Sequence, residues 1–335
     1  MVSIKDIAAR CNVSVATVSK ALNGHSDISA ATRETVKAVA AEMGYRPNSA
    51  ARALKTNRTY NLGVLFVDET MSGLTHEYFS HVLESFKVES EARGYDITFI
   101  NHNIGNQRAS YLEHCQYRGV DGVVVASVDF EDAEVLELIG SDLPLVTIDH
   151  VFNSKTAIVS DNIRGMRDIV TYIYSKGHRN IAFIHGEKTS VTKNRMASFY
   201  KTCYELGIEV PDENVREGVY HDTKTCAAVT RELLALKNRP TCIIFPDDFS
   251  YIGGMNAIRE AGLSIPDDIS AVGYDGITLS QMIAPRLTTY QQDTATLGRL
   301  AAGHLVNLIE HPKTTLPECI VVEGALLEGR SVRQL

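Results

Sequence analysis

From Tyr60 onward, short apolar runs alternate with amphipathic segments along the chain. The apolar runs have the length of buried strands, and the segments between them have the spacing of helices that cover a sheet. The predicted strands are Leu62–Val67, Ile97–Ile100, Val120–Ala126, Leu143–Ile148, Ile181–Ile184, Cys242–Phe245, Ile269–Val272 and Leu287–Tyr290. The predicted helices among them are Tyr78–Arg93, Arg164–Lys176, Asn194–Leu206 and Gly253–Ala261. This alternation is typical of α/β proteins with doubly wound parallel sheets.

The strands form two series, which predicts two subdomains in the body of the protein. The division falls near Asp161 and Asn162, and a late helix at Thr294–Leu308 is expected to return to the first subdomain. We therefore predict a body at residues 59–335. Its first subdomain is expected at about 60–161 plus 292–322, and its second at 162–291.

The residues that follow the predicted strands are rich in carboxylates. They are Asp68, His102, Ser127, Asp149, His150, His185, Asp247, Asp248 and Asp275. Ligands of open α/β sheets bind beyond the carboxyl ends of the strands, so we expect these side chains to converge on a cleft. Carboxylates only accept hydrogen bonds, which favours a neutral ligand rich in hydroxyl groups, and Tyr220 and Phe79 can supply a flat apolar face. The alternative is that these carboxylates start loops or cap helices.

The first 46 residues contain short helices that begin after Ser3, Ser14 and Ser29, each of which can cap the helix that follows it. Asn12 falls between the first two helices, where its tolerance of the left-handed conformation suits a sharp turn. Gly44 is placed to end the third helix. This spacing is typical of a helix-turn-helix, and a three-helix bundle with no role in DNA binding is the alternative.

The charge of the chain is divided between its two parts. Residues 1–60 hold nine Lys or Arg and four Asp or Glu, a net +5, which leaves −13 on the rest of a chain whose total is −8. A basic head on an acidic body favours a polyanionic partner at the head. Together with the helix spacing, this division predicts a DNA-binding domain at residues 1–46.

In a helix-turn-helix the second helix enters the major groove. Val15 and Ala16 can offer apolar contacts there, Thr17 and Ser19 can bond to phosphate or base, and Lys20 can reach a guanine O6/N7 edge. Phosphate contacts set the register without reading sequence. The predicted phosphate contacts are Ser3, Ser14, Asn23 and Tyr45.

Residues 47–58 begin at Pro47 and are predicted to be a hinge or linker. Asn48 can cap a short Ala-rich helix of about nine residues. An isolated helix needs roughly 12–15 residues to be stable in water, so this one should fold only when something supports it. An ordinary linker is the alternative.

The stretch from Ile4 to Leu54 resembles the DNA-binding head of the LacI/GalR family of bacterial repressors. The matching segments are Ile4–Ala8, Val13–Ser19, Asn23–Gly24, Tyr45–Asn48 and Ala51–Leu54. The resemblance implies a hinge helix over 48–56 that folds in the minor groove as a dimer, with Leu54 as an apolar wedge between base steps. The DNA contacts that it implies in this segment are Asn48, Ala51, Leu54 and Lys55. The family often has Arg at the position of Lys20, and a lysine bonds as a point charge rather than a fork.

The resemblance extends over nearly all 335 residues and, through the family, to periplasmic sugar-binding proteins. The matching segments of the body are Gly177–Ala182, Asn194–Phe199, Pro240–Thr241, Val272–Asp275 and Pro285–Thr289. The resemblance implies that Arg195 and Asp275 clamp an effector and that Asp248 and Tyr220 line its pocket. Further pocket positions matched by the resemblance are Phe79, Ser127 and Asp149. Pro246 and Gly276 depart from the residues that are usual in the family at these positions.

Other classes of protein lack their motifs in this sequence. The six cysteines include no C-x-x-C pair, which excludes the common zinc-finger and thioredoxin patterns and favours reduced thiols. His76, Glu77 and His81 do not have the H-E-x-x-H spacing, and no phosphate-binding loop or G-x-S-x-G elbow is present. We therefore expect no enzymatic activity, no cofactor and no metal. No apolar stretch of eighteen residues and no secretory signal is found, so we expect a cytoplasmic protein.

These features predict a homodimeric transcription regulator, most simply a repressor of a sugar-utilisation operon. Its heads would bind a pseudo-palindromic operator, and a neutral sugar between the subdomains would act as inducer. A phosphorylated or purine-like corepressor is the first alternative, and a sugar-binding transport receptor is an alternative from another class. The chain ends in a short polar segment at Glu328–Leu335 rather than an apolar heptad helix, which favours a dimer over a tetramer.

Overall fold

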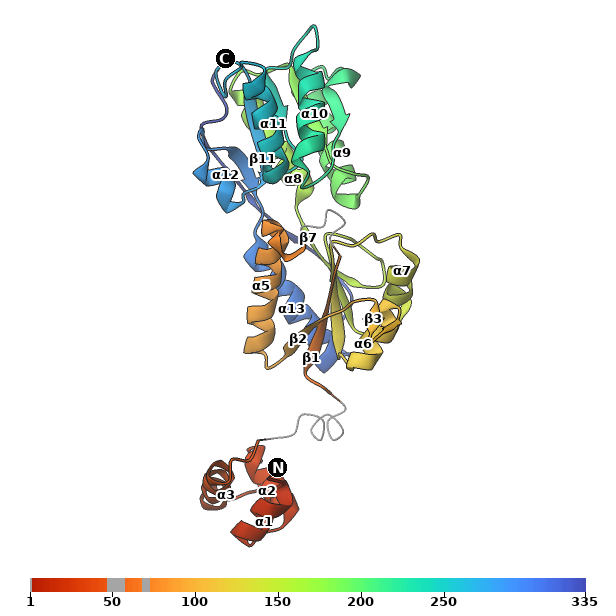
Figure 1. Cartoon of the computed structure of the whole chain (residues 1–335), viewed down its shortest axis with the longest axis vertical. Coiled ribbons are helices and arrows are strands. Elements are labelled where there is room, and N and C mark those ends of the chain that lie inside the picture. Colours follow the sequence, from red (N-terminus) through yellow and green to blue (C-terminus); the bar gives the residue numbers. More distant parts are fainter. Residues whose placement is uncertain (1, 47–57, 68–72) are drawn as a thin grey trace. The chain divides into compact units, whose positions relative to one another are not determined.

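The computed structural model describes residues 2–46, 58–67 and 73–335 (Figure 1). The chain divides into two compact units, Met1–Thr59 and Tyr60–Leu335. We call the first unit the head and the second the body. Among the described helices none is long and apolar enough to cross a membrane.

The head consists of α1 (Ile4–Cys11), α2 (Val15–Leu22) and α3 (Ala30–Glu42). These helices pack around a small core that is buried almost completely. Its buried members are Ile7, Ala8, Val18, Ala21, Val36 and Ala40. Ser3, Ser14 and Ser29 cap the three helices as the sequence predicts, and Asn12 ends α1 in the left-handed conformation with φ 50°. The predicted helix-turn-helix arrangement is therefore present.

The first subdomain of the body is built on a parallel sheet of order β13-β7-β6-β5-β1-β2. The strands are β1 (Asn61–Phe66), β2 (Asp96–Phe99), β5 (Gly122–Ala126), β6 (Leu145–Ile148), β7 (Thr156–Ser160) and β13 (Cys319–Val322). A short antiparallel ribbon of β3 (Asn103–Ile104) and β4 (Gln107–Arg108) lies outside this sheet.

Successive residues of the central strands supply opposite faces of this sheet. Val64 and Val124 pack with α5 (Glu77–Ala92) and α13 (Thr294–Glu310) in one core. Leu65 and Val125 pack with α6 (Tyr111–Arg118) and α7 (Ala133–Gly140) in another. Helices α5 and α13 approach closely, since a Cβ on Gly298 would lie 2.1 Å from the carbonyl oxygen of Val82. The late helix thus returns to the first subdomain, as predicted.

The second subdomain is built on a sheet of order β14-β12-β11-β10-β8-β9, in which only the pair β12 and β14 is antiparallel among the described strands. The strands are β8 (Ile181–His185), β9 (Val215–Glu217), β10 (Cys242–Ile244), β11 (Ser270–Asp275), β12 (Thr288–Gln291) and β14 (Ala325–Leu327). The helices are α8 (Asn162–Ser175), α9 (Ser190–Glu205), α10 (Thr223–Leu234), α11 (Asp248–Glu260) and the short α12 (Thr278–Met282). Two 3-10 turns, η1 (Gly73–Thr75) and η2 (Asp212–Asn214), complete the described elements.

The chain passes between the two subdomains after β7, after β12 and after β13. Every predicted strand corresponds to a strand of the structure, with bounds shifted by a few residues. Strands β3, β4, β7, β9, β13 and β14 were not predicted, because they are short and polar residues interrupt them or lie at their ends. The α/β class and the doubly wound parallel sheets are confirmed.

Candidate DNA-reading surface and effector cleft

The outer face of α2 carries most of the residues that the sequence predicts to read DNA. Val15 is 45% exposed, and Ala16 and Lys20 are also exposed. Thr17 and Ser19 are half-buried. Helix α2 turns its opposite face, with the buried Val18 and Ala21, toward the core of the head. This amphipathic division leaves the predicted base contacts accessible to a partner.

Several predicted phosphate contacts also have a local structural role. Ser3 caps α1 in a reciprocal capping box with Asp6. Ser14 Oγ accepts from the backbone N–H of Thr17 at 3.0 Å, and Asn23 Nδ2 donates to the carbonyl oxygen of Ser19 at 2.7 Å. Tyr45 is half-buried against the core of the head. The remaining predicted contacts lie outside the described residues: Asn48, Ala51, Leu54 and Lys55.

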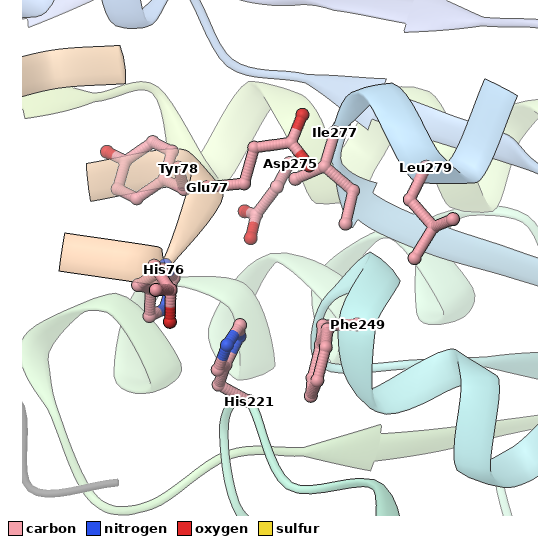
Figure 2. Close-up of a pocket in the computed structure, with 9 residues that line it drawn as sticks. His76, Glu77, Tyr78, His221, Phe249, Asp275, Ile277 and Leu279 are labelled. Atoms are coloured by element: carbon pink, nitrogen blue, oxygen red, sulfur yellow. The ribbon is translucent and has the colours of Figure 1, made fainter. Parts of the chain in front are cut away.

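A small pocket lies between the two subdomains of the body (Figure 2). Its volume is about 130 Å³. The first subdomain contributes Thr75, His76, Glu77 and Tyr78. The second subdomain contributes His221, Phe249, Asp275, Ile277 and Leu279. Its wall therefore combines two carboxylates with aromatic and aliphatic side chains.

Contacts across this cleft join the two subdomains. The backbone N–H of Thr278 donates to Glu77 Oε1 at 2.5 Å, and Ser190 Oγ donates to the carbonyl oxygen of Asp149 at 2.9 Å. The rings of His76 and His221 stack with centroids 4.1 Å apart, and Phe249 stacks on the other face of His221 at 3.9 Å. These contacts describe a closed cleft.

Arg195, on α9, is 4% exposed and interacts electrostatically with Asp275, which lines the pocket. Its Nε donates to Asn162 Oδ1 at 2.7 Å, and its Nη1 donates to the carbonyl oxygen of Pro246 at 2.9 Å. The guanidinium lies 3.4 Å from the centre of the Tyr274 ring. Burial alone would lower the pKa of Arg195, but the adjacent tyrosines and acids outweigh it and raise that pKa. Arg195 is therefore a fixed positive charge.

Asp275 ends β11 with the unusual φ of 100° and lines the pocket. Its Oδ1 accepts a hydrogen bond from Gln292 Nε2 at 2.6 Å. Burial raises the pKa of Asp275 to about 7, although the charge of Arg195 opposes this shift. The Asp275 carboxyl group therefore passes between its protonated and charged forms near neutral pH.

Asp149 follows β6 and also has a positive φ, 59°. Its Oδ2 accepts from the Tyr78 hydroxyl at 2.7 Å, and its Oδ1 accepts from the backbone N–H of Ser160 at 2.9 Å. Burial raises the pKa of Asp149, and the hydrogen bonds and Arg195 oppose that shift. Asp149, Asp275 and Arg195 interact electrostatically, so three predicted effector residues do converge.

Asp248 and Tyr220 do not line the pocket. Asp248 is 1% exposed; its oxygens accept from Thr289 Oγ1 at 2.6 Å and from the backbone N–H of Ile277 at 3.0 Å. Burial, helped by the charge of Asp275, raises the pKa of Asp248 well above its ordinary value. The Tyr220 hydroxyl pairs with Thr192 Oγ1 at 2.8 Å. Direct contact of Asp248 or Tyr220 with an effector stays a prediction.

The other residues expected near the strand ends are distributed more widely. Phe79 packs its ring against Phe66 and His76, and Ser127 is half-buried with φ 52°. Neither lines the pocket. His102 pairs with Glu134 within the first subdomain at 3.0 Å. Asp68 lies outside the described residues, and within the described ranges no group of three or more His, Cys, Asp or Glu is arranged to hold a metal.

Sequence reasoning missed much of the pocket wall. The residues not predicted as effector contacts are Thr75, His76, Glu77, Tyr78, His221, Phe249, Ile277 and Leu279. A usable signal was their position, because His221 and Phe249 directly follow the predicted Tyr220 and Asp248, and Ile277 lies two residues after Asp275. Tyr78 has the same signal, because it directly precedes the predicted Phe79. Thr75, His76 and Glu77 have no such signal, since they come to the cleft through η1 and the start of α5.

Two family models match the chain in separate regions. The model for bacterial regulatory proteins of the lacI family matches residues 3–48, and the model for a periplasmic binding protein-like domain matches residues 170–332. The chain is similar over its whole length to the HTH-type transcriptional repressor PurR of Mannheimia succiniciproducens, with 32% identity over 341 residues and full coverage of both proteins. It is 30% identical over 339 residues to the probable HTH-type transcriptional repressor ExuR of Bacillus subtilis, covering 100% of this chain and 99% of that protein.

Solved structures show the same two-part architecture. The lac repressor dimer bound to operator and the anti-inducer ONPF has a TM-score of 0.81 at 26% identity, with 99% of both chains covered. The transcriptional regulator CelR in complex with cellobiose has a TM-score of 0.71 at 26% identity, covering 99% of this chain and 100% of that one. The chain therefore belongs to the LacI family of bacterial regulatory proteins, and it is a DNA-binding transcriptional repressor controlled by ligand binding in its periplasmic-binding-protein-like body.

Proposed function

We propose that this repressor acts as a homodimer in the cytoplasm, that it reads its operator through the outer face of α2, and that a small neutral sugar bound in the cleft releases it from DNA. Residues 1–46 then form the DNA-binding domain, 47–58 the linker, and 59–335 the part that binds effector and dimerises. The effector would act by changing the position of the two subdomains relative to each other. This change would in turn alter the position of the two linkers in a dimer.

The charge of the pocket wall is the observation that carries the proposal for a neutral effector. Glu77 and Asp275 line the pocket, and within the described part of the chain its lining includes no Lys or Arg. The nearest buried cation, Arg195, already donates to Asn162 and Pro246 and stacks on Tyr274. An anionic ligand would face carboxylates without a free partner, whereas sugar hydroxyls can donate to them.

The size of the pocket bears on how a sugar would enter. Ligand pockets usually measure roughly 300–1,000 Å³, and this one measures about 130 Å³. The stack of His76 on His221 and the bridge from Glu77 to Thr278 close the cleft. A sugar would be admitted when the subdomains part and would replace these contacts with its own. The relative solved with cellobiose supports this choice of ligand class.

A purine-like corepressor is the second candidate, because the pocket also holds a stack of flat rings. His221 lies between His76 and Phe249, with centroids 4.1 Å and 3.9 Å away. A planar heterocycle could take a place in such a stack. A phosphorylated ligand is less well matched, for the reason of charge given above.

A thermal-shift and calorimetry screen separates these candidates. The full-length dimer is tested against neutral mono- and disaccharides, the matching sugar phosphates, and purine bases and nucleosides. A ligand at a hundred times its Kd should stabilise the body by about 2.7 kcal/mol. Each hit is then tested for release of operator DNA, with Asp275→Asn as the matched control that should weaken the response to a neutral sugar. Stabilisation only by sugar phosphates or purines would overturn the neutral-sugar proposal.

A further inference from the structure

An ion pair in the head joins the DNA-reading helix to the loop that follows it. Lys20 lies in the last turn of α2, one helical turn after Ala16 on the exposed face. Its Nζ pairs with Oδ2 of Asp27, which lies in the loop between α2 and α3. The side chains are 46% and 54% exposed, so the pair lies at the surface. The hydrogen bond from Lys20 lowers the pKa of Asp27, so this side chain is a carboxylate at neutral pH.

The loop is anchored on both sides of Asp27. The backbone N–H of His25 donates to the carbonyl oxygen of Lys20 at 3.1 Å. Arg33 Nη2 donates to the carbonyl oxygens of His25 and Ile28, at 2.8 and 3.3 Å. Arg33 thus ties the loop to α3 while His25 ties it to α2. Asp27 is held next to Lys20 by this framework rather than by the ion pair alone.

The carboxylate of Asp27, next to the DNA-reading helix α2, weakens the electrostatic attraction of the head to DNA. The phosphate backbone supplies most of the affinity of such proteins, and an acid near it opposes binding. The other acids of the head are paired elsewhere: Asp6 with Ser3, Glu34 with Lys37 and Glu42 with Arg10. Asp27 instead pairs with a side chain on the exposed face of α2. A gain other than affinity is needed to account for its position.

That gain is selectivity between bases, which depends on how many N–H donors the Lys20 ammonium keeps for DNA. A lysine ammonium has three N–H donors on a flexible stem and bonds to many acceptors without preference. With one donor held by Asp27, two remain and their direction is restricted. Guanine presents two acceptors, N7 and O6, on its major-groove edge, whereas adenine presents one acceptor and a donor. The held ammonium therefore matches guanine better than the other bases.

We propose that Asp27 is a specificity-determining residue of this repressor, which restricts Lys20 to guanine at one operator position and lowers its attraction to phosphates. The proposal rests on the DNA-reading role proposed above for Lys20. It adds that the loop, and not α2 alone, sets the sequence preference at that position.

The test uses full-length dimer and a random double-stranded DNA library, followed by competition binding on the selected operator with each base at every position. The variants are Asp27→Ala, Lys20→Ala and the double variant, with Glu34→Ala as a control that removes one acid from the head without touching Lys20. Asp27→Asn keeps the shape of the side chain and replaces Asp27→Ala in the test if the alanine variant lowers the melting temperature of the head. We expect Asp27→Ala to bind non-specific DNA more tightly and to lose about fivefold or more of its guanine preference at one position.

The double variant separates the two parts of the argument. We expect that Asp27→Ala has no further effect on base preference once Lys20 is alanine. If Asp27→Ala strengthens binding to all sequences equally, as Glu34→Ala should, Asp27 is only a repulsive charge and the inference fails. If Lys20→Ala changes no base preference, the reading role proposed for Lys20 fails instead.

Discussion

Glu77 of the first subdomain accepts a hydrogen bond from the backbone N–H of Thr278, the first residue of α12 in the second subdomain. No side chain of its own caps α12, whose N-cap is Ile277. Glu77 therefore supplies the missing cap from across the cleft. A negative charge is favourable at the start of a helix, because the N–H groups there are unpaired. Closure of the cleft and the order of α12 are linked by this one contact.

Glu77→Gln should loosen α12 and favour the open cleft. A helix cap contributes about 1 kcal/mol, so the amide of Thr278 should exchange its hydrogen roughly fivefold faster. Hydrogen exchange read by mass spectrometry over α12 measures this effect. Glu84→Gln is the matched control, because Glu84 lies on the same helix α5 and pairs with Lys87. Equal exchange in both variants would show that Glu77 does not hold the cleft closed.

Asp275 should make the stability of the body depend on pH near neutrality. Burial raises its pKa to about 7 in the folded protein, from 3.8 as the ordinary value. The folded state then binds more protons than the unfolded state between these values, so stability falls as pH rises from about 4 to about 7. Asp275→Asn removes this contribution. Urea unfolding at intervals from pH 5 to 8 should show a smaller decline in the variant, and an unchanged decline would contradict the raised pKa.

The same proton should be released when a neutral sugar binds. Sugar hydroxyls donate hydrogen bonds to the carboxylate and so favour its charged form, which means that affinity should rise as pH increases through about 7. Calorimetry in two buffers of different ionisation enthalpy measures the released proton directly. Near pH 6.5 the wild-type protein should release a fraction of one proton for each sugar bound, and Asp275→Asn should release none from this site. Affinity that does not change with pH would remove Asp275 from the effector contacts.

Arg195→Lys should weaken the body and abolish the effector response while the head keeps its fold. A lysine cannot donate to both Asn162 and Pro246 from a planar group stacked on Tyr274. Leaving a buried acceptor unpaired costs about 1–3 kcal/mol. Tyr274→Phe keeps the ring beneath the guanidinium and is the control; we expect it to change stability less. Melting curves of both variants measure this difference, and operator binding is measured separately. Equal losses of stability in Arg195→Lys and Tyr274→Phe would refute the stated role of Arg195.

The sequence predicted the outline of this molecule better than the wall of its cleft. The three capped helices of the head and the strand-helix alternation of the body depend on local patterns that each segment carries itself. Strand β13 depends instead on its partner, since Cys319–Val322 joins the first sheet only by pairing with β7. No local pattern distinguishes such an edge segment from a loop.

The cleft residues show the same limit. Asp149 and Asp275 were found because they end strands, where ligands of α/β sheets bind. His76 reaches the cleft through the start of α5 and meets His221, 145 positions later in the chain, only because the subdomains close on each other. Asp248 was placed in the pocket by the same rule that found Asp275, yet its oxygens are occupied by Thr289 and Ile277 inside the second subdomain. Position along a strand does not fix the direction of a side chain.

His221→Ala should separate the two effector candidates. Its ring lies between His76 and Phe249, and each stacked pair contributes roughly 0.5–1.5 kcal/mol beyond the area it buries. Removing the ring opens the closed cleft and enlarges the pocket, so a sugar that must displace this stack should bind equally well or more tightly. A planar heterocycle that joins the stack should instead bind about tenfold more weakly. Calorimetry with the ligand found in the screen gives the sign of the change, and His221→Phe, which keeps a flat ring, should restore wild-type behaviour in either case. Weaker binding of a neutral sugar to His221→Ala would mean that the ring is a contact of the sugar rather than a part of the closed gate.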